Sequence, residues 1–284
     1  MNKESKILIV GLGMIGASYA EKLHGCGFYT GGISARQSTI DKALESGIID
    51  CGTIDVTKEF VSRFDIVVFA LYPKLFVEWV TLHQDCFKSG ALITDVTGVK
   101  GSIVYRIQDM LRSDVEFIAA HPMAGRELSG IDNRNIKVFE GANYIVTPTK
   151  ANSQEAIETA KELGQILGFG HISTLTPEEH DEMIAFLSQL THCIAVSLMC
   201  SKDSTHLVDY TGDSFRDLTR IATINENMWP ELFAMNKTQL LEQMTLFEKE
   251  FARLKEAIAT DDLETVKEMM ITSTERRKFF NKKK

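Results

Sequence analysis

The sequence predicts an α/β domain followed by an all-helical domain. Three observations support this fold class. Short apolar runs alternate with helix-compatible stretches over the first 175 residues, the first run leads into the glycine-rich segment GLGMIG, and strand patterns stop after residue 176. Strands that alternate with helices at this spacing are typical of βαβ units, which build a mainly parallel, doubly wound sheet.

The expected strands are short runs rich in apolar and β-branched residues. They are KILIV (6–10), YTGGIS (29–34), FDIVVFAL (64–71), GALITDV (90–96), VEFIAA (115–120), NYIVTP (143–148) and HISTLT (171–176). The helix-compatible stretches between the early strands are 36–46, 73–86 and 99–112, and a further helical pattern follows the glycines up to Leu23. Each such stretch is long enough to cross the sheet and return the chain for a parallel strand.

The change of pattern near residue 176 coincides with a helix-start signal. Thr176 is suited to cap a helix, Pro177 to its first position and Glu179 to its third, and Thr with Glu forms a capping box. We therefore expect an α/β domain over residues 1–175 and an all-helical domain over residues 176–284.

Composition narrows the function classes. The 284 residues carry a net charge of -8, which disfavours nucleic acid as a partner because phosphate binding needs a basic surface. Five scattered cysteines without a CxxC pair favour neither a disulfide framework nor a metal site. The chain has no run of 18 apolar residues and no signal-peptide pattern, so we expect no membrane span and a cytoplasmic location.

The glycine-rich segment indicates a dinucleotide site. Gly11, Gly13 and Gly16 fit GxGxxG directly after a strand, with Met14 and Ile15 opening the following helix. The first glycine permits the tight turn, the second lets the backbone approach a pyrophosphate, and the third allows close helix–strand packing. The alternative is a glycine-rich turn of an α/β protein that binds nothing.

The end of the second expected strand bears on the choice of cofactor. An acidic residue there would hold the ribose 2′-hydroxyl of NAD. Here Ser34 stands at that place, followed by Arg36, Gln37 and Ser38, and this group suits a 2′-phosphate because an arginine forms charge-assisted bonds with it. We therefore favour NADP over NAD, although Arg36 could simply be a solvated residue at a helix start.

Two histidines are candidates for the site. His121 follows the strand VEFIAA and is expected at the carboxyl edge of the sheet, where ligands of open α/β sheets bind. Beside a nicotinamide it could accept the proton of an alcohol, or it could be a turn residue bonded to backbone. His192 follows Asp181 and Ser188 at spacings of 7 and 4, a polar line on an apolar helix that is either a pocket wall or part of the core.

The segment DSFRDLTRIA places two arginines four residues apart. Arg216 and Arg220 share a helix face with interleaved acids, of which Asp217 could orient an arginine toward a substrate carboxylate. The alternative is a surface ladder of ion pairs that contributes little. Trp229 precedes the helix breaker Pro230, a place typical of a packing anchor at a pocket or a subunit contact.

These segments together resemble the prephenate/arogenate dehydrogenase family of tyrosine biosynthesis, over nearly the whole chain. The matching segments are GLGMIGAS, DKALESGIID, ALITDVTGVKG, AAHPMAGRELSGI, NYIVTPT, SQLTHCIAVSL and FRDLTRIATINENMW. The resemblance implies a Rossmann-type dinucleotide-binding domain, a helical domain that dimerises, and a site in the cleft between them.

The resemblance also implies residue roles. His121 matches the histidine that bonds the ring 4-hydroxyl of the substrate and takes its proton, and His192 matches a substrate contact. Arg220 matches the arginine that binds a substrate carboxylate. Trp229 matches a tryptophan at the edge of the site that can come from the partner subunit, and Glu127 falls where relatives place a gating or substrate-contacting acid.

Two departures from the family pattern stand out. Gly98 replaces the serine that usually precedes Val-Lys-Gly, and Thr97, one place earlier, could supply the missing hydroxyl. Thr191 replaces a proline before His192, which a helix interior tolerates better. The stretch 34–39 is similar to the NADP-using, arogenate-type members, which agrees with the interpretation of the 2′ pocket.

The expected function is therefore prephenate dehydrogenase, an oxidative decarboxylation of prephenate to 4-hydroxyphenylpyruvate with NAD(P). Arogenate dehydrogenase with NADP and a cyclohexadienyl dehydrogenase of dual specificity remain alternatives. A non-catalytic NADP-binding sensor would not need a base at His121. A 3-hydroxyacid dehydrogenase would need a lysine in SQLTHCIAVSL, which has none.

Overall fold

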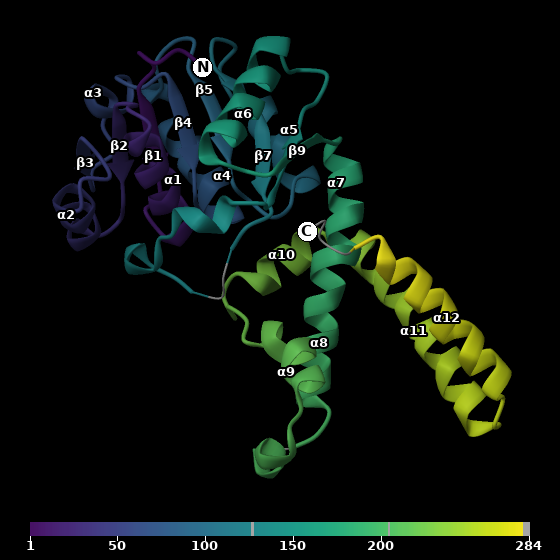
Figure 1. The fold of residues 1–284 in the computed structure, drawn as a ribbon. Helices are drawn as coiled ribbons and strands as arrows, with labels where there is room; N and C mark the ends of the chain where they lie inside the picture. Colours follow the sequence, from purple (N-terminus) through teal and green to yellow (C-terminus); the bar gives the residue numbers. More distant parts are fainter. Residues whose placement is uncertain (126–127, 204, 281–284) are drawn as a thin grey trace. The chain divides into compact units, whose positions relative to one another are not determined.

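The computed structural model describes residues 1–125, 128–203 and 205–280 (Figure 1). The chain divides into two compact units, Met1–Asn236 and a second that begins at Lys237. The predicted boundary after residue 175 lies inside the first unit, so the division into a dinucleotide-binding and a helical domain stays a prediction.

A six-stranded parallel sheet forms the centre of the first unit, in the order β3-β2-β1-β4-β5-β6. Its strands are β1 (Ile7–Val10), β2 (Thr30–Ile33), β3 (Cys51–Thr53), β4 (Ile66–Phe69), β5 (Leu92–Asp95) and β6 (Glu116–Phe117). This order is that of doubly wound dinucleotide-binding folds, whose ligands lie beyond the carboxyl ends of β1 and β4. β3 was absent from the expected strands because CGT is short, half-buried and contains a glycine.

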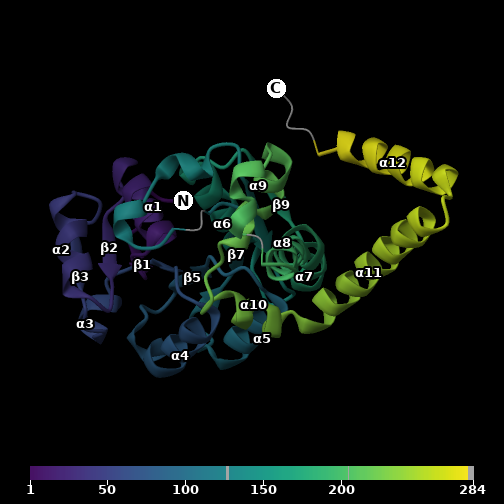
Figure 2. The ribbon, with the colours of Figure 1, turned by 90° about the horizontal axis from the view of Figure 1, so that it is seen from below.

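Helices cover both faces of this sheet. They are α1 (Met14–Gly25), α2 (Gln37–Glu45), α3 (Lys58–Val61), α4 (Pro73–His83), α5 (Gly101–Met110) and α6 (Gln154–Leu167). Ile7 and Ile9 of β1 are buried in the cluster that holds α1 and α6, whereas Leu8 and Val10 are buried with α4 and α5. Figure 2 shows these two pairs of helices on opposite sides of the sheet. The near-continuous apolar strands of the sequence follow from this double coverage.

A second sheet corrects one expectation. The run 115–120 is not one strand of the parallel sheet: β6 ends at Phe117, and a new strand, β7 (Ala119–Pro122), pairs antiparallel with β8 (Asn143–Thr147), which pairs parallel with β9 (His171–Thr174). The backbone N–H of Ala120 donates to Asp95 at the end of β5, 3.1 Å away, which holds β7 just beyond the parallel sheet. His121 therefore lies within a strand, opposite Ile145, and does not end one.

The helical part of the first unit begins at the predicted cap. The backbone N–H of Glu179 donates to the Thr176 hydroxyl (3.2 Å), and the Glu179 carboxylate accepts from the Thr176 N–H (2.8 Å), so the capping box is present. The helices are α7 (Pro177–Ile184), a π-helical segment (Ala185–Leu190), α8 (Thr191–Cys200), α9 (Asp213–Thr219) and α10 (Trp229–Met235). π-helical turns inside helices are frequent at functional sites.

The helical run Pro177–Cys200 is long enough and apolar enough to cross a membrane by length and composition alone, with a mean hydropathy of 1.7 over its most apolar window. The sequence expectation of no membrane span relied on the absence of an unbroken run of 18 apolar residues. That criterion misses this segment because Asp181, Ser188 and His192 interrupt it. One such helix is weak evidence for a membrane protein, since core helices pass the same test. Only 28% of the window is buried.

The second unit is a helical hairpin of α11 (Lys237–Ala259) and α12 (Leu263–Lys278). Asp261 in the turn has a φ of 55°, a left-handed conformation that Asp tolerates. The carboxylate of Asp262 then caps α12 by accepting the Thr265 N–H at 3.1 Å.

Candidate active site

The glycine turn after β1 has the geometry of a phosphate-binding loop. Gly11 has a φ of +98°, and a Cβ there would lie 2.5 Å from the Ala70 carbonyl oxygen, so only glycine fits. A Cβ on Gly16 would lie 1.9 Å from the Gly11 carbonyl oxygen. Gly13 has nothing within 4 Å of its Cβ position and directly precedes α1, so backbone amides and open space meet at a helix N-terminus. These residues fit a bound pyrophosphate.

The residues expected at the ribose lie just beyond β2. Ser34 is half-buried directly after the strand, and its hydroxyl accepts the backbone N–H of Arg36 at 3.4 Å. Arg36 and Ser38 are exposed at the start of α2, while the Gln37 amide bonds Asp41 at 2.8 Å. The turn therefore presents a guanidinium and two hydroxyls.

His121 is half-buried on β7. Its Nδ1 lies 2.9 Å from Nε2 of His180. Its Nε2 and Cε1 lie near Gly98, because a Cβ on that glycine would be 3.8 and 3.9 Å from them. Burial lowers the pKa of His121 well below its ordinary value, and the neighbouring His180 and the Lys100 ammonium add to this. The ring is therefore neutral at neutral pH, as a base must be.

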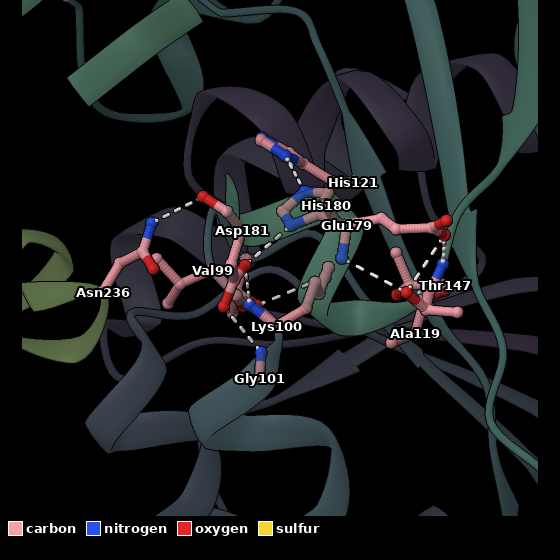
Figure 3. A network of polar contacts seen from close by, with 12 residues as sticks. Val99, Lys100, Gly101, Ala119, His121, Thr147, Glu179, His180, Asp181 and Asn236 are labelled. Carbon is pink, nitrogen blue, oxygen red and sulfur yellow. Dashed lines mark hydrogen bonds and ion pairs between the residues drawn. The ribbon is translucent and has the colours of Figure 1, made fainter. Parts of the chain in front are cut away.

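His180 and Asp181, on α7, connect His121 to α5 (Figure 3). His180 is fully buried, and its Nδ1 lies 2.8 Å from Oδ1 of Asp181. The Asp181 carboxylate also accepts the backbone N–H groups of Lys100 and Gly101, each at 2.8 Å. Burial lowers the pKa of His180, although the bond to Asp181 opposes this.

A buried lysine lies beneath His121. The ammonium of Lys100 is fully buried and donates to Asp95 (2.7 Å), to the Ala120 carbonyl oxygen (2.6 Å) and to the Thr97 hydroxyl (3.3 Å). Burial lowers the pKa of Lys100, while Asp95 raises it. The Thr97 hydroxyl also bonds Asp95 and lies 3.0 Å from the Val99 carbonyl oxygen. Because the Thr97 hydroxyl makes these bonds to buried groups, we do not expect it to replace the serine missing at Gly98.

His192 and Trp229 lie together. Their ring centroids are 3.9 Å apart at an interplanar angle of 31°, and both belong to the same chain. The Nδ1 of His192 lies 2.8 Å from the Ser188 carbonyl oxygen, so Nδ1 carries a proton and donates to it. This bond uses the backbone carbonyl of Ser188 and not its side chain, so the polar line predicted along this helix stays a prediction.

The arginine segment is largely exposed. Arg216 pairs with Asp213 at 3.2 Å, which is the surface ion pair that its spacing allowed. Arg220 begins the 3₁₀ turn Arg220–Ala222, and both it and Asp217 are exposed. Glu127 lies outside the described residues. Among those the structure describes, no three His, Cys, Asp or Glu side chains are grouped to hold a metal ion.

Sequence reasoning missed several residues around His121. The role of His180 is ambiguous from the sequence alone, and no motif singles out Asp95 or Lys100. Asn236, at the end of α10, donates to the Asp181 carbonyl oxygen and to the Gln189 side chain, both at 2.9 Å. One signal was present for Asp95, which follows the apolar strand residues of ALIT and is buried, because a buried acid needs partners.

Two family models match the chain. A family model described as the nucleotide-binding domain of prephenate dehydrogenase matches residues 18–173, more than half of the chain. A second, described as the dimerization domain of prephenate dehydrogenase, matches residues 176–272.

The chain belongs to the prephenate dehydrogenase family. A Bacillus subtilis prephenate dehydrogenase is 30% identical over 272 residues, covering 92% of this chain and 72% of the relative. A crystal structure of Aquifex aeolicus prephenate dehydrogenase, in complex with hydroxyphenyl propionate and NAD+, is 29% identical with a TM-score of 0.90 and 99% coverage of both chains. Synechocystis arogenate dehydrogenase is 26% identical with a TM-score of 0.82, covering 96% of this chain and 99% of the other.

Family membership confirms the expected fold class, a Rossmann-type domain followed by helices, and the expected enzyme class, an NAD(P)-dependent dehydrogenase. Prephenate dehydrogenase family members differ in substrate, as the arogenate dehydrogenase among the neighbours shows. The roles of individual residues in this chain stay predictions.

Proposed function

We propose that this chain is a prephenate dehydrogenase that converts prephenate to 4-hydroxyphenylpyruvate and CO2, with NADP favoured over NAD. The observation that supports it most is the position of His121. Its Nδ1 is occupied by His180, and its Nε2 lies near Gly98, a residue without a side chain just beyond the end of β5. A neutral histidine held in this way can accept a proton from a substrate hydroxyl.

A bound nicotinamide dinucleotide supplies the acceptor for the hydride that leaves ring carbon 4 of the substrate. His121 takes the proton of the 4-hydroxyl on Nε2 as that carbon becomes a carbonyl carbon. The bond from the ring to its carboxylate then breaks, its electron pair flows into the ring, and CO2 leaves. The resulting phenolate oxygen recovers a proton, and formation of the aromatic ring drives the step.

The remaining groups bind and orient the substrate. Arg220 would bind one substrate carboxylate, with Asp217 as its neighbour, because a guanidinium matches the two oxygens of a carboxylate. His192, stacked on Trp229, would contact the substrate ring or side chain. Glu127 stays a candidate contact. Such orientation supplies much of the catalysis in a site that needs only one base.

The turn after β2 supports the NADP preference. Gly11, Gly13 and Gly16, with Met14 and Ile15, would hold the pyrophosphate, as their geometry fits. A 2′-phosphate would then meet Ser34, Arg36, Gln37 and Ser38. No carboxylate stands at 34–38 to repel it.

Arogenate dehydrogenase is the second candidate. Arogenate carries an amino group where prephenate has a keto group. The same turn at 34–38 favours this reading, because it is similar to that of the NADP-using, arogenate-type members. A cyclohexadienyl dehydrogenase that takes both substrates would use the same base and the same carboxylate contacts.

We further propose that the chain works as a cytoplasmic homodimer. Large apolar side chains stay exposed in the range matched by the dimerization model. In the first unit they include Phe186, Leu187, Met199 and Leu218, and in the second unit Leu241, Leu246, Phe247, Phe251, Ile258, Met270 and Ile271. Exposed apolar surface of this extent is typical of an interface. A second copy would cover it. Light scattering should give a dimer, and Phe251→Glu should weaken it; a wild-type monomer, or a chain found in the membrane fraction, would contradict this.

One set of measurements tests the activity. Initial rates are followed by absorbance at 340 nm with prephenate and with arogenate, each with NAD and with NADP. We expect the highest kcat/KM with prephenate and NADP. Faster turnover of arogenate would favour the second candidate, and no absorbance change in any of the four assays would reject the enzyme.

A further inference from the structure

Asp181, His180 and His121 form a series of hydrogen bonds, and the donor of each bond follows from the carboxylate of Asp181. The Asp181 carboxylate only accepts, and Lys100 and Gly101 each donate a backbone N–H to it. The Nδ1 of His180, 2.8 Å from the same carboxylate, must therefore be the donor. In a neutral ring this makes Nε2 of His180 the acceptor.

The assignment carries through to His121. Since Nε2 of His180 accepts, Nδ1 of His121 must carry the proton that joins the two rings, 2.9 Å apart. The lone pair of His121 is then on Nε2, the nitrogen that lies near Gly98. His180 and Asp181 thus select the Nδ1–H tautomer of His121 and leave Nε2 as the nitrogen that can accept a proton.

Asp181 is itself fixed from three sides. Its carboxylate, which comes from α7, lies at the N-terminus of α5, where the N-cap residue makes no side-chain capping bond. There its two oxygens accept the backbone N–H groups of Lys100 and Gly101. An anion is favoured at that end of a helix. The side-chain amide of Asn236 donates to the backbone carbonyl oxygen of Asp181 at 2.9 Å. The carboxylate therefore anchors α7 to α5 and sets the angle at which His180 meets His121.

The charges around the pair are compatible with this role. Lys100 is the nearest buried cation, and its ammonium is matched by Asp95 at 2.7 Å. When His121 gains a proton, its Nδ1–H still faces a neutral acceptor with a carboxylate behind it. Loss of that acceptor would leave a buried N–H without a partner, or let the ring take the other tautomer, which blocks Nε2.

We propose that His180, backed by Asp181, is a positioning residue that holds His121 in its Nδ1–H tautomer and presents Nε2 to the substrate hydroxyl. The proposal rests on the role of His121 as base in the proposed function. It assigns His180 a part in the reaction although it does not touch the substrate.

Kinetics of two variants separate positioning from packing. His180→Phe keeps a ring but removes the acceptor, and should lower kcat about 100-fold, the scale of general-base catalysis, with KM for prephenate within about threefold. His180→Gln restores an acceptor oxygen near the place of Nε2 and should recover most of kcat. Equal loss in both variants would overturn the proposal, because packing rather than the acceptor would then matter.

A matched control removes a different contact between the same two helices. The Tyr105 hydroxyl of α5 donates to Glu178 of α7 at 2.6 Å. Glu178→Gln weakens this bond and leaves His180 untouched, so kcat should stay within about twofold of wild type. A loss as large as that of His180→Phe would show that any loosening of α7 suffices, and would overturn the proposal.

A spectroscopic test does not depend on activity. Nitrogen-15 NMR of histidine-labelled protein distinguishes protonated from unprotonated ring nitrogens, with His121→Asn to assign the signal. We expect the proton of His121 on Nδ1 in the wild type and in His180→Gln, and a mixture or the other tautomer in His180→Phe. An unchanged tautomer in His180→Phe would overturn the proposal. If His121→Asn kept full activity, the proposed function would fail instead, whatever the tautomer.

Discussion

His121 and His180 face each other at 2.9 Å between Nδ1 and Nε2, although 59 residues separate them in the sequence. His121 lies on β7, an edge strand of the second sheet, and His180 lies on α7, the first helix after that sheet. This contact ties the expected base to a helix whose N-terminus the sequence marks only by its capping box. The behaviour of His121 is therefore set by residues on both sides of the predicted domain boundary.

The first prediction concerns the pH dependence of activity. A base must be neutral, and burial, His180 and Lys100 lower the pKa of His121. Turnover should therefore persist below pH 6.5, the ordinary pKa of histidine, and fall only at more acidic pH. The measurement is kcat against pH between 5 and 9. An acid limb centred at or above 6.5 would contradict the lowered pKa.

The same two histidines should make stability depend on pH. The pKa values of both are lowered in the folded state. Above about pH 6.5 neither state binds these protons, and stability is at its full value. As pH falls further, the unfolded chain binds protons that the folded one does not, so the free energy of unfolding declines until the folded-state pKa values are reached.

Urea unfolding followed by circular dichroism at pH 7.5 and pH 5.5 measures this effect. The double variant His121→Asn with His180→Gln should lose less stability between the two pH values than the wild type. The remaining histidines are common to both proteins and cancel in the difference. If both proteins lost the same free energy of unfolding between the two pH values, His121 and His180 would not be the cause of the pH dependence.

A third prediction addresses the base directly. His121→Asn removes the acceptor nitrogen but keeps a polar side chain of similar size. We expect kcat to fall by about 10²- to 10⁴-fold, with the dissociation constant for NADP unchanged, because the glycine turn is not altered. Single-turnover rates and fluorescence titration with the cofactor measure the two quantities. Retained turnover would defeat the assignment.

How much the sequence could predict depends on the distance along the chain between the groups involved. Gly11, Gly13 and Gly16 lie within six residues, and each has the contact or open space that the motif requires. The capping box at Thr176 is equally local and is present. By contrast, the bonds from Asp181 to Lys100 and Gly101 join residues about eighty positions apart, and no periodicity indicates them.

The strand errors have a similar cause. The run 115–120 is apolar without a break from Phe117 to Ala120, yet Phe117 pairs with β5 and Ala119 with β8. Both halves are buried, so the pattern of apolar residues does not change where the chain leaves one sheet for the other. Only the partners of the backbone differ, and pairing partners are tertiary information.

A fourth prediction tests the carboxylate contact. Arg220→Ala should lower kcat/KM for prephenate about 10- to 100-fold, mainly through KM, because a hydrogen bond to a charged group contributes about 1.5–3 kcal/mol. Arg216→Ala is the matched control four residues away; it breaks only the exposed pair with Asp213 and should change little. The outcome that would contradict the role is an equal effect of the two substitutions.

The last prediction concerns the empty side-chain position at Gly98. Its φ lies outside the left-handed region, and a Cβ there would meet His121 Nε2 and Leu232 Cδ1, each at 3.8 Å, which is ordinary van der Waals contact. Gly98→Ser therefore fits without moving the backbone and places a hydroxyl beside the expected base. A hydrogen bond of about 1 kcal/mol to the reacting groups would raise kcat/KM about fivefold. Gly98→Ala adds the same Cβ without the hydroxyl and should give no gain. If Ser and Ala behaved alike, the hydroxyl would have no part in the reaction here, whereas a gain in Ser alone would place the substrate hydroxyl within reach of both Gly98 and His121.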